Sequence, residues 1–262
     1  MAGRSYNQVL WVTALLGCLG CQGTLSPQGR QWLQNGYRAS AAGEHRTVIE
    51  TTDAFLGEYA RSSRADEAYY LRGLAKYHLA DRNGAKADLS AALEKTDKRE
   101  VRGKAALALG DLAWDAEDMA ASAEMYRTAV DNMDAGVTPA DHAAYRLGCA
   151  LQRLGRWQEA DLQFSRVMEL FPGTVLGSRA ARRVHGRAWA IQVAAFGDRA
   201  HAEALVRGLA ERGVQAAASA MLEDDKPVFV VQTGRFSTWE QATSALPSLK
   251  KLQPDAFVTA TR

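Results

Sequence analysis

Cysteine and histidine are among the side chains that could act as nucleophiles or metal ligands, and their placement in this sequence argues against both roles. None of the histidines stands beside a cysteine or a carboxylate at the spacing of a metal site. No phosphate-binding glycine loop and no zinc-protease HExxH motif occurs either. We therefore predict a binding protein that is not an enzyme and needs no metal or cofactor. The scattered histidines are His45, His78, His142, His185 and His201.

Two of the three cysteines follow a short apolar segment near the N-terminus. Residues Val9–Gly17 are apolar, and the polar start before them contains Arg4. This run is far shorter than the roughly 20 residues needed to cross a bilayer. A basic start, an apolar core and small residues after it are typical of a secretory signal. Cys18 and Cys21 follow the run, whereas Cys149 lies far along the chain, where we expect a small buried hydrophobic residue.

The residues Leu15-Leu16-Gly17-Cys18 resemble the bacterial lipobox. The resemblance implies that residues 1–17 are removed and that Cys18, carrying lipid, becomes the first residue of the mature chain. Cys21 is the alternative, with the signal ending at residue 20, and a plain cleaved signal with incidental cysteines is a third interpretation. Residues 18–29 would form a tether, and the acyl chains would anchor the protein to a membrane.

Composition favours a folded, soluble, helix-rich protein. The hydrophobic fraction of 47% and the charged fraction of 24% are those of globular domains, and 262 residues suffice for one or two of them. A formal net charge of +2 provides no concentrated basic surface, so we expect no nucleic-acid partner. Frequent alanine and only 6 prolines favour helices packed closely on helices.

Four glycines recur at nearly constant spacing through the middle of the chain. Gly36, Gly73, Gly110 and Gly148 are separated by 37 or 38 residues. A fixed period in this range is the signature of a solenoid of repeated helix pairs. Because glycine lets two helices cross closely, the period predicts an all-α solenoid over residues 30–186.

The pattern around the last of these glycines resembles the tetratricopeptide repeat. The second unit matches well, the third more loosely and the first poorly, because it has Val48 and Thr52 where alanine and an aromatic residue are expected. Residues 174–184 are expected to form a capping helix. The matching positions are Leu147, Gly148, Gly155, Ala160, Phe164 and Pro172 in the last unit, Gly73, Ala85, Leu89 and Ala92 in the second, Leu109, Gly110, Tyr126 and Ala129 in the third, and Gly36 and Gly43 in the first.

First-helix positions line the inner groove of such a solenoid. Several of them are aromatic in this sequence, which favours a surface that binds a peptide or a protein. Ordinary packing between amphipathic helices is the alternative interpretation. The predicted groove residues are Tyr70, Tyr77, His78, Asp111, Trp114, Tyr145, Gln152 and Arg153.

Near residue 187 the pattern changes to alternating strands and helices. The expected order is strand, helix, strand, strand, helix, strand, a small α+β domain with a four-stranded antiparallel sheet. Pro247 falls inside the second helix and should kink or restart it. The strands are expected at residues 189–196, 214–221, 228–232 and 256–261, the helices at 198–212 and 238–252, and a turn at 224–225.

The two halves of this segment repeat at an offset of 40 residues. The pattern, a glutamine followed by an aromatic residue and then a helix with a fixed alanine, resembles the sporulation-related repeat (SPOR) family over residues 187–262. This resemblance implies binding to peptidoglycan, with a preference for glycan strands stripped of their peptides, often at division sites. The matched pairs are Gln192 and Gln232, Phe196 and Phe236, Ala202 and Ala242, and Leu209 and Leu249.

The face of the sheet that the helices leave open is the predicted glycan site. Strand alternation places Gln192, Val230 and Gln232 on this face, and Ile191 and Val231 on the other. Amide groups donate and accept hydrogen bonds, which suits sugar hydroxyl and N-acetyl groups. A solvated strand position is the alternative interpretation of each glutamine. SPOR proteins often carry arginine where Val230 stands, so the resemblance implies altered contacts there.

A basic cluster flanks the junction between the two segments. Its simplest interpretation is a solvated linker face, and attraction to anionic envelope polymers is the alternative. The cluster consists of Arg179, Arg182, Arg183 and Arg187.

The sequence thus predicts a lipid-anchored protein of the bacterial envelope. We expect residues 30–186 to hold an unidentified envelope protein or peptide, and residues 187–262 to bind peptidoglycan glycan strands. The expected location is the outer membrane, facing the periplasm, with a role in cell division or cell-wall maintenance. The alternative is an adaptor in outer-membrane assembly or cell-wall synthesis that binds little glycan.

Overall fold

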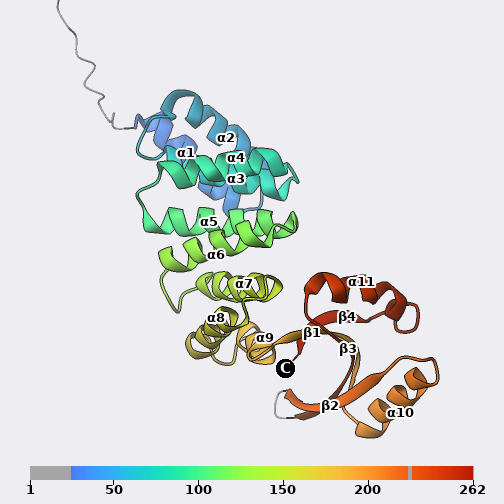
Figure 1. The fold of residues 1–262 in the computed structure, drawn as a ribbon. Helices are drawn as coiled ribbons and strands as arrows, with labels where there is room; N and C mark the ends of the chain where they lie inside the picture. The colour runs from blue at the N-terminus through green and yellow to red at the C-terminus, as the bar shows by residue number, and fades with distance from the viewer. Residues whose placement is uncertain (1–24, 224–225, 262) are drawn as a thin grey trace, which may run out of the picture.

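The computed structural model describes residues 25–223 and 226–261. The predicted signal segment, both lipidation candidates Cys18 and Cys21, and the predicted turn at residues 224–225 lie outside these ranges. In the described part, a stack of helices is followed by a small α+β domain (Figure 1). The helices of the stack are α1 (Pro27–Ala41), α2 (His45–Tyr59), α3 (Ala65–His78), α4 (Arg82–Lys95), α5 (Arg99–Asp115), α6 (Met119–Asn132), α7 (Ala140–Arg153), α8 (Trp157–Leu170) and α9 (Val175–Arg183).

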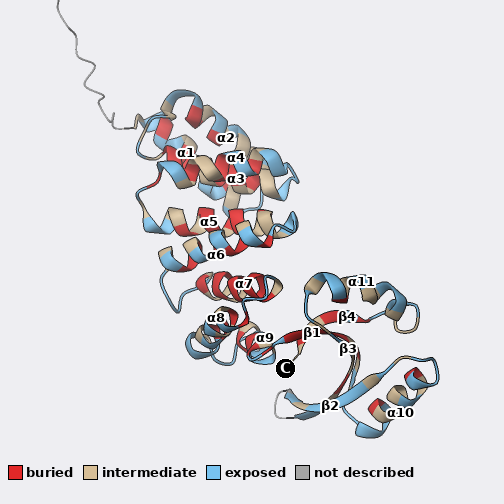
Figure 2. Ribbon diagram, in the orientation of Figure 1, coloured by how far each residue is buried: buried red, intermediate tan, exposed pale blue. Residues whose placement is uncertain are grey.

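Helices α1 to α8 form four helical hairpins that stack into a solenoid, and α9 packs against α8 at its end (Figure 1). This arrangement confirms the all-α solenoid that the glycine period predicts. A helix over most of the expected cap, residues 174–184, is also present as α9. The buried residues line the contacts between successive helices (Figure 2).

The periodic glycines stand where the two helices of a hairpin touch. A Cβ added to Gly73 would lie 2.7 Å from Leu89, one added to Gly110 would lie 2.6 Å from Tyr126, and one added to Gly148 would lie 2.6 Å from Phe164. Real Cβ atoms essentially never approach other atoms this closely, so each of these positions excludes a larger side chain. The large residue on the second helix fills the space that the glycine leaves.

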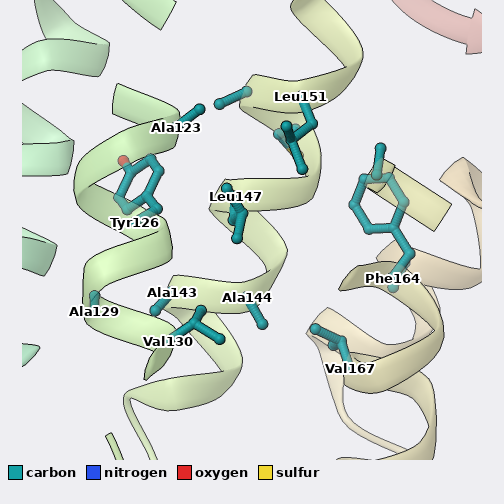
Figure 3. Packing of buried hydrophobic residues seen from close by; sticks show 14 of the residues in the cluster. Ala123, Tyr126, Ala129, Val130, Ala143, Ala144, Leu147, Leu151, Phe164 and Val167 are labelled. Carbon is teal, nitrogen blue, oxygen red and sulfur yellow. The ribbon is translucent and has the colours of Figure 1, made fainter. Parts of the chain in front are cut away.

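Small alanines complete this packing between units. Ala160 is fully buried, and Phe164 beside it has no exposed surface. Figure 3 shows Phe164 and Tyr126 on either side of α7, with Leu147 and Leu151 between them. Because interiors are packed as densely as organic crystals, this alternation of small and large residues fixes the distance between neighbouring hairpins.

The first hairpin reaches a similar packing with different residues. Gly36 is less crowded, because an added Cβ would lie 3.4 Å from Thr51. Val48 and Thr52 occupy the second-helix positions and are buried. The Thr52 hydroxyl donates to the backbone oxygen of Val48 at 2.6 Å, which satisfies a polar group that would otherwise be costly to bury. The first hairpin therefore packs without the alanine and the aromatic residue that the repeat pattern has at these positions.

The C-terminal domain has the predicted βαββαβ order. Its sheet is antiparallel with strand order β2-β3-β1-β4, and helices α10 and α11 lie on the same face of it (Figure 1). The core between helices and sheet contains Ile191, Val193, Val231 and Leu209. The elements are β1 (Ala188–Phe196), α10 (Arg199–Ala210), β2 (Ala216–Glu223), β3 (Lys226–Phe236), α11 (Trp239–Lys250) and β4 (Phe257–Thr261).

Two features of this domain differ from a regular alternating pattern. On β1, Gln192 pairs with Gln232 but Ala194 pairs with Val231, so Val193 is an extra residue that forms a β-bulge. The helix α11 continues through Pro247 as one element, which corrects the expectation that the proline restarts it. A proline removes one backbone donor and crowds the carbonyl four residues before it, and these costs do not end α11.

Three tryptophans join the domain to the solenoid. Trp189 on β1 lies 5.3 Å from Trp157 on α8 and 4.8 Å from Trp239 on α11, measured between ring centroids. Trp157 and Trp189 are 9% and 1% exposed, so both belong to the core of the C-terminal domain. An ion pair of 2.7 Å between Arg187 and Asp161 of α8 lies at the same junction. The last repeat and the α+β domain therefore share a core.

Candidate functional site

The face of the sheet opposite α10 and α11 carries polar and small side chains. Gln192 and Gln232 lie directly across from each other on β1 and β3, as the half-repeat predicts. Ile191 and Val231, their chain neighbours, are fully buried on the helix-covered side. Val230 lies on the same open face but is only 4% exposed, because it is surrounded by its strand neighbours.

Residues from the edge strands extend this surface. Ser219 on β2 pairs with Val230, and Phe257 on β4 pairs with Gln192. The bulge at Val193 returns Ala195 to this face, opposite Val230. We call the set the open sheet face: Gln192, Ala195, Ser219, Met221, Val228, Val230, Gln232, Phe257 and Thr259.

Phe257 is a member of this face that the sequence prediction missed. Its side chain is 50% exposed, which is unusual for an aromatic residue in a strand. An exposed ring beside amide groups can pack against the C–H face of a sugar while the amides bind its hydroxyls. The signal for it was present, since strand alternation from residue 257 places this side chain on the face of Gln192.

The Gln232 amide is oriented by its neighbour on the edge strand. The Thr261 hydroxyl donates to Gln232 Oε1 at 3.2 Å. The amide nitrogen of Gln232 is left as a donor for a bound molecule. The open sheet face contains no charged side chain, so it would recognise a ligand through neutral hydrogen bonds and packing.

On the solenoid, several predicted groove residues already contact other side chains of the solenoid. The Tyr77 hydroxyl donates to Asp115 at 3.1 Å, and the Tyr126 hydroxyl donates to Asp111 at 2.6 Å. His78 is exposed and stacks on His45, with 4.5 Å between the ring centroids. We call Tyr70, Tyr77, His78, Asp111 and Trp114 the first-helix surface.

The tyrosines of this region stay protonated over the physiological range. Burial raises the pKa of Tyr70 to about 12. Burial, together with the charge of Asp111 and the hydrogen bond to it, raises the pKa of Tyr126 above its usual range. Burial and the hydrogen bond to Asp115 act in the same direction on Tyr77. The Tyr77 and Tyr126 hydroxyls therefore serve as hydrogen-bond donors.

Three predicted groove residues lie at the junction with the C-terminal domain instead of in an open groove. Gln152 is fully buried, and it contacts Arg183 of α9 through both ends of its amide. The Arg153 guanidinium lies 4.5 Å from the ring centroid of Trp239 and 5.4 Å from that of Trp114. Tyr145 faces α9 and the open sheet face. The prediction was wrong for Gln152, because the element after the last repeat covers its first helix.

The described residues hold no cluster of three or more histidine, cysteine or acidic side chains that could bind a metal ion. Cys149 is buried, as expected for a small hydrophobic residue. In the described part of the chain, no helix combines the length and the apolar character that a membrane span requires.

Comparison with known families decides the nature of the C-terminal domain. The family model described as "SPOR domain" matches residues 186–260. Residues 186–260 form a SPOR domain. The SPOR family is one of peptidoglycan-binding domains of the cell envelope, and the match covers both helices and all but the last residue of the four strands. No curated protein matches this chain.

Solved structures resemble this chain at low identity. A double mutant of MamA, "MamA RS-1 ArsTM double mutant", has a TM-score of 0.50 at 14% identity, covering 62% of this chain and 83% of that chain. MamA from Desulfovibrio magneticus RS-1, residue 41 to the end, has a TM-score of 0.49 at 14% identity, covering 62% and 84%. YrrB, described as a TPR protein with an unusual peptide-binding site, has a TM-score of 0.49 at 18% identity, covering 86% of each chain.

The first of these likenesses concerns the fold alone. Together with the glycine contacts, it establishes the helices α1 to α9 as a tetratricopeptide-like solenoid.

Proposed function

We propose that this protein binds peptidoglycan glycan strands with the open sheet face of its SPOR domain and holds an envelope protein or peptide on its first-helix surface. The two domains share a core at the tryptophan junction, so one chain would link both ligands at a fixed separation. The observation that carries the glycan assignment is the direct pairing of Gln192 with Gln232 on a neutral face. Two equivalent amides side by side suit a ligand that repeats along its length, as a polysaccharide does.

The test is co-sedimentation of the purified mature chain with peptidoglycan sacculi, before and after an amidase removes the stem peptides. The proposal expects pelleting with both preparations and stronger pelleting after amidase treatment, because peptide-free strands can reach the open sheet face. Absence of the chain from both pellets would refute glycan binding and leave the adaptor function, in which the solenoid alone carries the activity.

We further propose that lipid on Cys18, or on Cys21, anchors the chain in the outer membrane facing the periplasm. The lipobox-like residues before Cys18 support this proposal. Labelled palmitate should enter the protein, and Cys18→Ala should abolish the label while Cys21→Ala should keep it. The reverse pattern would assign the lipid to Cys21, and labelling of neither cysteine would remove the anchor.

A role in cell division or cell-wall maintenance follows from the preference for peptide-free strands. Such strands accumulate where amidases act, which includes the division site. A fluorescent fusion of the full-length protein should gather there, and the Gln192→Ala, Gln232→Ala double variant should spread around the cell. An unchanged pattern in the double variant would show that glycan binding does not direct the protein.

The partner site on the solenoid can be tested by crosslinking at single positions. His78 is exposed on the first-helix surface. Gln158 is exposed on α8, which is the second helix of the last hairpin and lies outside that surface. A photoreactive residue at 78 should crosslink one defined protein in cells, and the same residue at 158 should not. Equal crosslinking from both positions would remove the first-helix surface as the partner site.

A further inference from the structure

The open sheet face is one wall of a cleft, and the end of the solenoid is the other. The cleft has a volume of about 530 Å³. Its second wall consists of Arg179, Arg182 and Arg183 from α9 and of Tyr145 from α7. In Figure 1 the sheet curves so that this face opens toward α9, while α10 and α11 lie on its outer side. The cleft therefore combines residues from both domains.

The two walls differ in charge. The open sheet face is neutral, whereas the α9 wall contributes three arginines, and none of the described residues that line the cleft is acidic. The three arginines stand three and four positions apart on a helix, which places them on one side of it. The ligand of this cleft should accordingly carry negative charge on one side and neutral polar groups on the other.

The arginine wall is held in place by buried contacts. Arg183 Nη1 donates to Gln152 Oε1 at 2.9 Å, and Gln152 Nε2 donates to the backbone oxygen of Arg183 at the same distance. Gln152 itself is fully buried. Arg179, one turn earlier, is exposed and forms no ion pair with a described residue. One guanidinium is thus fixed and a second is available to a ligand.

Peptidoglycan from which the stem peptide has been removed carries the matching charge. The peptide is linked through an amide to the lactyl group of N-acetylmuramic acid, and hydrolysis of that amide leaves a free carboxylate on every disaccharide. Arginine binds carboxylates through charge-assisted and often bidentate hydrogen bonds. On an intact strand the same position carries no charge and is extended by a peptide that must fit between two walls.

We propose that Arg179 and Arg183 of α9 bind the lactyl carboxylates of peptide-free glycan strands whose sugars lie on the open sheet face. The glycan site then spans both domains, and helix α9 sets the preference for stripped strands. This inference rests on the proposed glycan-binding function and adds the chemical feature that is recognised and the residues that recognise it.

The test compares two probes on the mature chain: peptide-free glycan strands with free lactyl carboxylates, and the same strands after methyl esterification. The unchanged chain should bind the free strands at least about ten-fold more tightly, since hydrogen bonds to charged groups are the stronger ones. The Arg179→Gln, Arg183→Gln double variant should lose that difference while still binding the esterified strands. The matched control is the Arg199→Gln, Arg207→Gln double variant on α10, which removes the same charge from the opposite side of the domain.

The outcomes separate this inference from the function on which it rests. Equal binding of the two probes by the unchanged chain, or a preserved preference in the α9 double variant, would overturn the arginine assignment and leave the glycan site on the sheet. Binding of neither probe would overturn the glycan function itself. Thermal melts accompany each variant, and because Arg183 contacts Gln152, the Arg179→Gln single variant decides the matter if the double variant unfolds.

Discussion

The first-helix surface and the open sheet face differ in what their polar side chains already bind. On the solenoid, Tyr77 is bonded to Asp115, and Asp111 accepts a hydrogen bond from the buried Tyr126. On the sheet, Gln192 forms no side-chain hydrogen bond with a described residue, and Gln232 uses only its oxygen. A side chain that is already hydrogen-bonded must break that bond before it binds a ligand, and this lowers the net free energy gained on binding. A polar side chain without such a bond carries no such cost.

An aromatic and charged surface is therefore not automatically the stronger candidate site. Trp114 lies between Arg146 and Arg153, at 4.9 and 5.4 Å from their guanidinium carbons, so its ring faces are partly occupied. The sheet offers smaller and less conspicuous groups, but the exposed Phe257 and the two half-buried glutamines lie together on one wall of a cleft.

The largest effect is expected from Trp189→Ala, which removes the residue that joins the two regions. Trp189 is 1% exposed between Trp157 and Trp239, and loss of such a buried aromatic side chain costs about 3–5 kcal/mol. The free energy of unfolding of the SPOR domain, measured by urea denaturation, should fall by that amount. Leu162→Ala on α8 is the control, because this side chain is 68% exposed and should contribute within about 0.5 kcal/mol.

A loss below about 1 kcal/mol for Trp189→Ala would contradict the core that Trp189 shares with Trp157 of the solenoid. The two binding surfaces would then have no fixed separation, and the cleft between α9 and the sheet would not be preformed.

The next effect concerns the glycine contacts that build the solenoid. An alanine Cβ at position 148 would lie 2.6 Å from the Phe164 ring, so Gly148→Ala should cost about 1–3 kcal/mol by overpacking, more than the roughly 1 kcal/mol that alanine gains in a helix. Gly208→Ala in α10 is the matched substitution in the SPOR domain, where an added Cβ meets nothing within 4 Å. It should raise stability by up to about 1 kcal/mol. Thermal melts that shift in the same direction for both variants would contradict this account of the period.

The third prediction is an acid sensitivity confined to the solenoid. Burial by itself would raise the pKa of Glu67, but hydrogen bonds from Arg64, Lys98 and Tyr37 outweigh it and lower the pKa to about 2. A carboxyl with a lowered pKa stabilises the fold above its unfolded pKa of about 4.3, and this stabilisation is lost as the pH falls toward 2. Solenoid stability should therefore drop between about pH 4.3 and 2, by an amount on the order of 1–3 kcal/mol.

Glu67→Gln should lower solenoid stability at pH 7 and flatten its decline in acid, as measured by urea unfolding at pH 7, 4 and 3. Glu100→Gln is the control, because the Glu100 side chain is 76% exposed and its pair with Lys104 is screened by solvent. An acid decline of equal size in the Glu67→Gln variant would assign the sensitivity to other carboxyl groups.

The helical solenoid and the order of elements in the SPOR domain could be predicted from repeating patterns in the sequence. Period-37 glycines and buried alanines specify close helix crossings, and the half-repeat of the SPOR domain specifies βαββαβ with its glutamines on the open face. Phe257 could have been placed by the same alternation. The bulge at Val193 could not, because an extra residue in one strand is defined only by its pairing with the other strand.

The burial of Gln152 and the contact of Arg153 with the SPOR domain could not be predicted either, because both depend on the element that follows the last repeat. Gln152 and Arg153 occupy groove positions of a repeating pattern, and that pattern holds only while another repeat follows. Here α9 and Trp239 take the place of the next repeat, so Gln152 is buried and Arg153 contacts the SPOR domain. In the basic cluster, the Arg183 side chain is hydrogen-bonded to Gln152 and Arg187 forms an ion pair with Asp161. These two arginines are therefore not part of a freely solvated face, and only the tertiary structure shows this.

The fourth prediction tests the central claim, that the open sheet face binds glycan. Gln192→Ala and Gln232→Ala each remove a neutral hydrogen-bonding group worth about 0.5–1.5 kcal/mol, so each should weaken binding to amidase-treated peptidoglycan by a few-fold to about ten-fold without lowering the melting temperature. Ile191→Ala, one residue away on the helix-covered face, should lower the melting temperature instead, by creating a cavity. The measurement is co-sedimentation at a series of protein concentrations, with thermal melts of the same samples. The account predicts weaker pelleting for both folded glutamine variants, and pelleting of both at the level of the unchanged chain would contradict it.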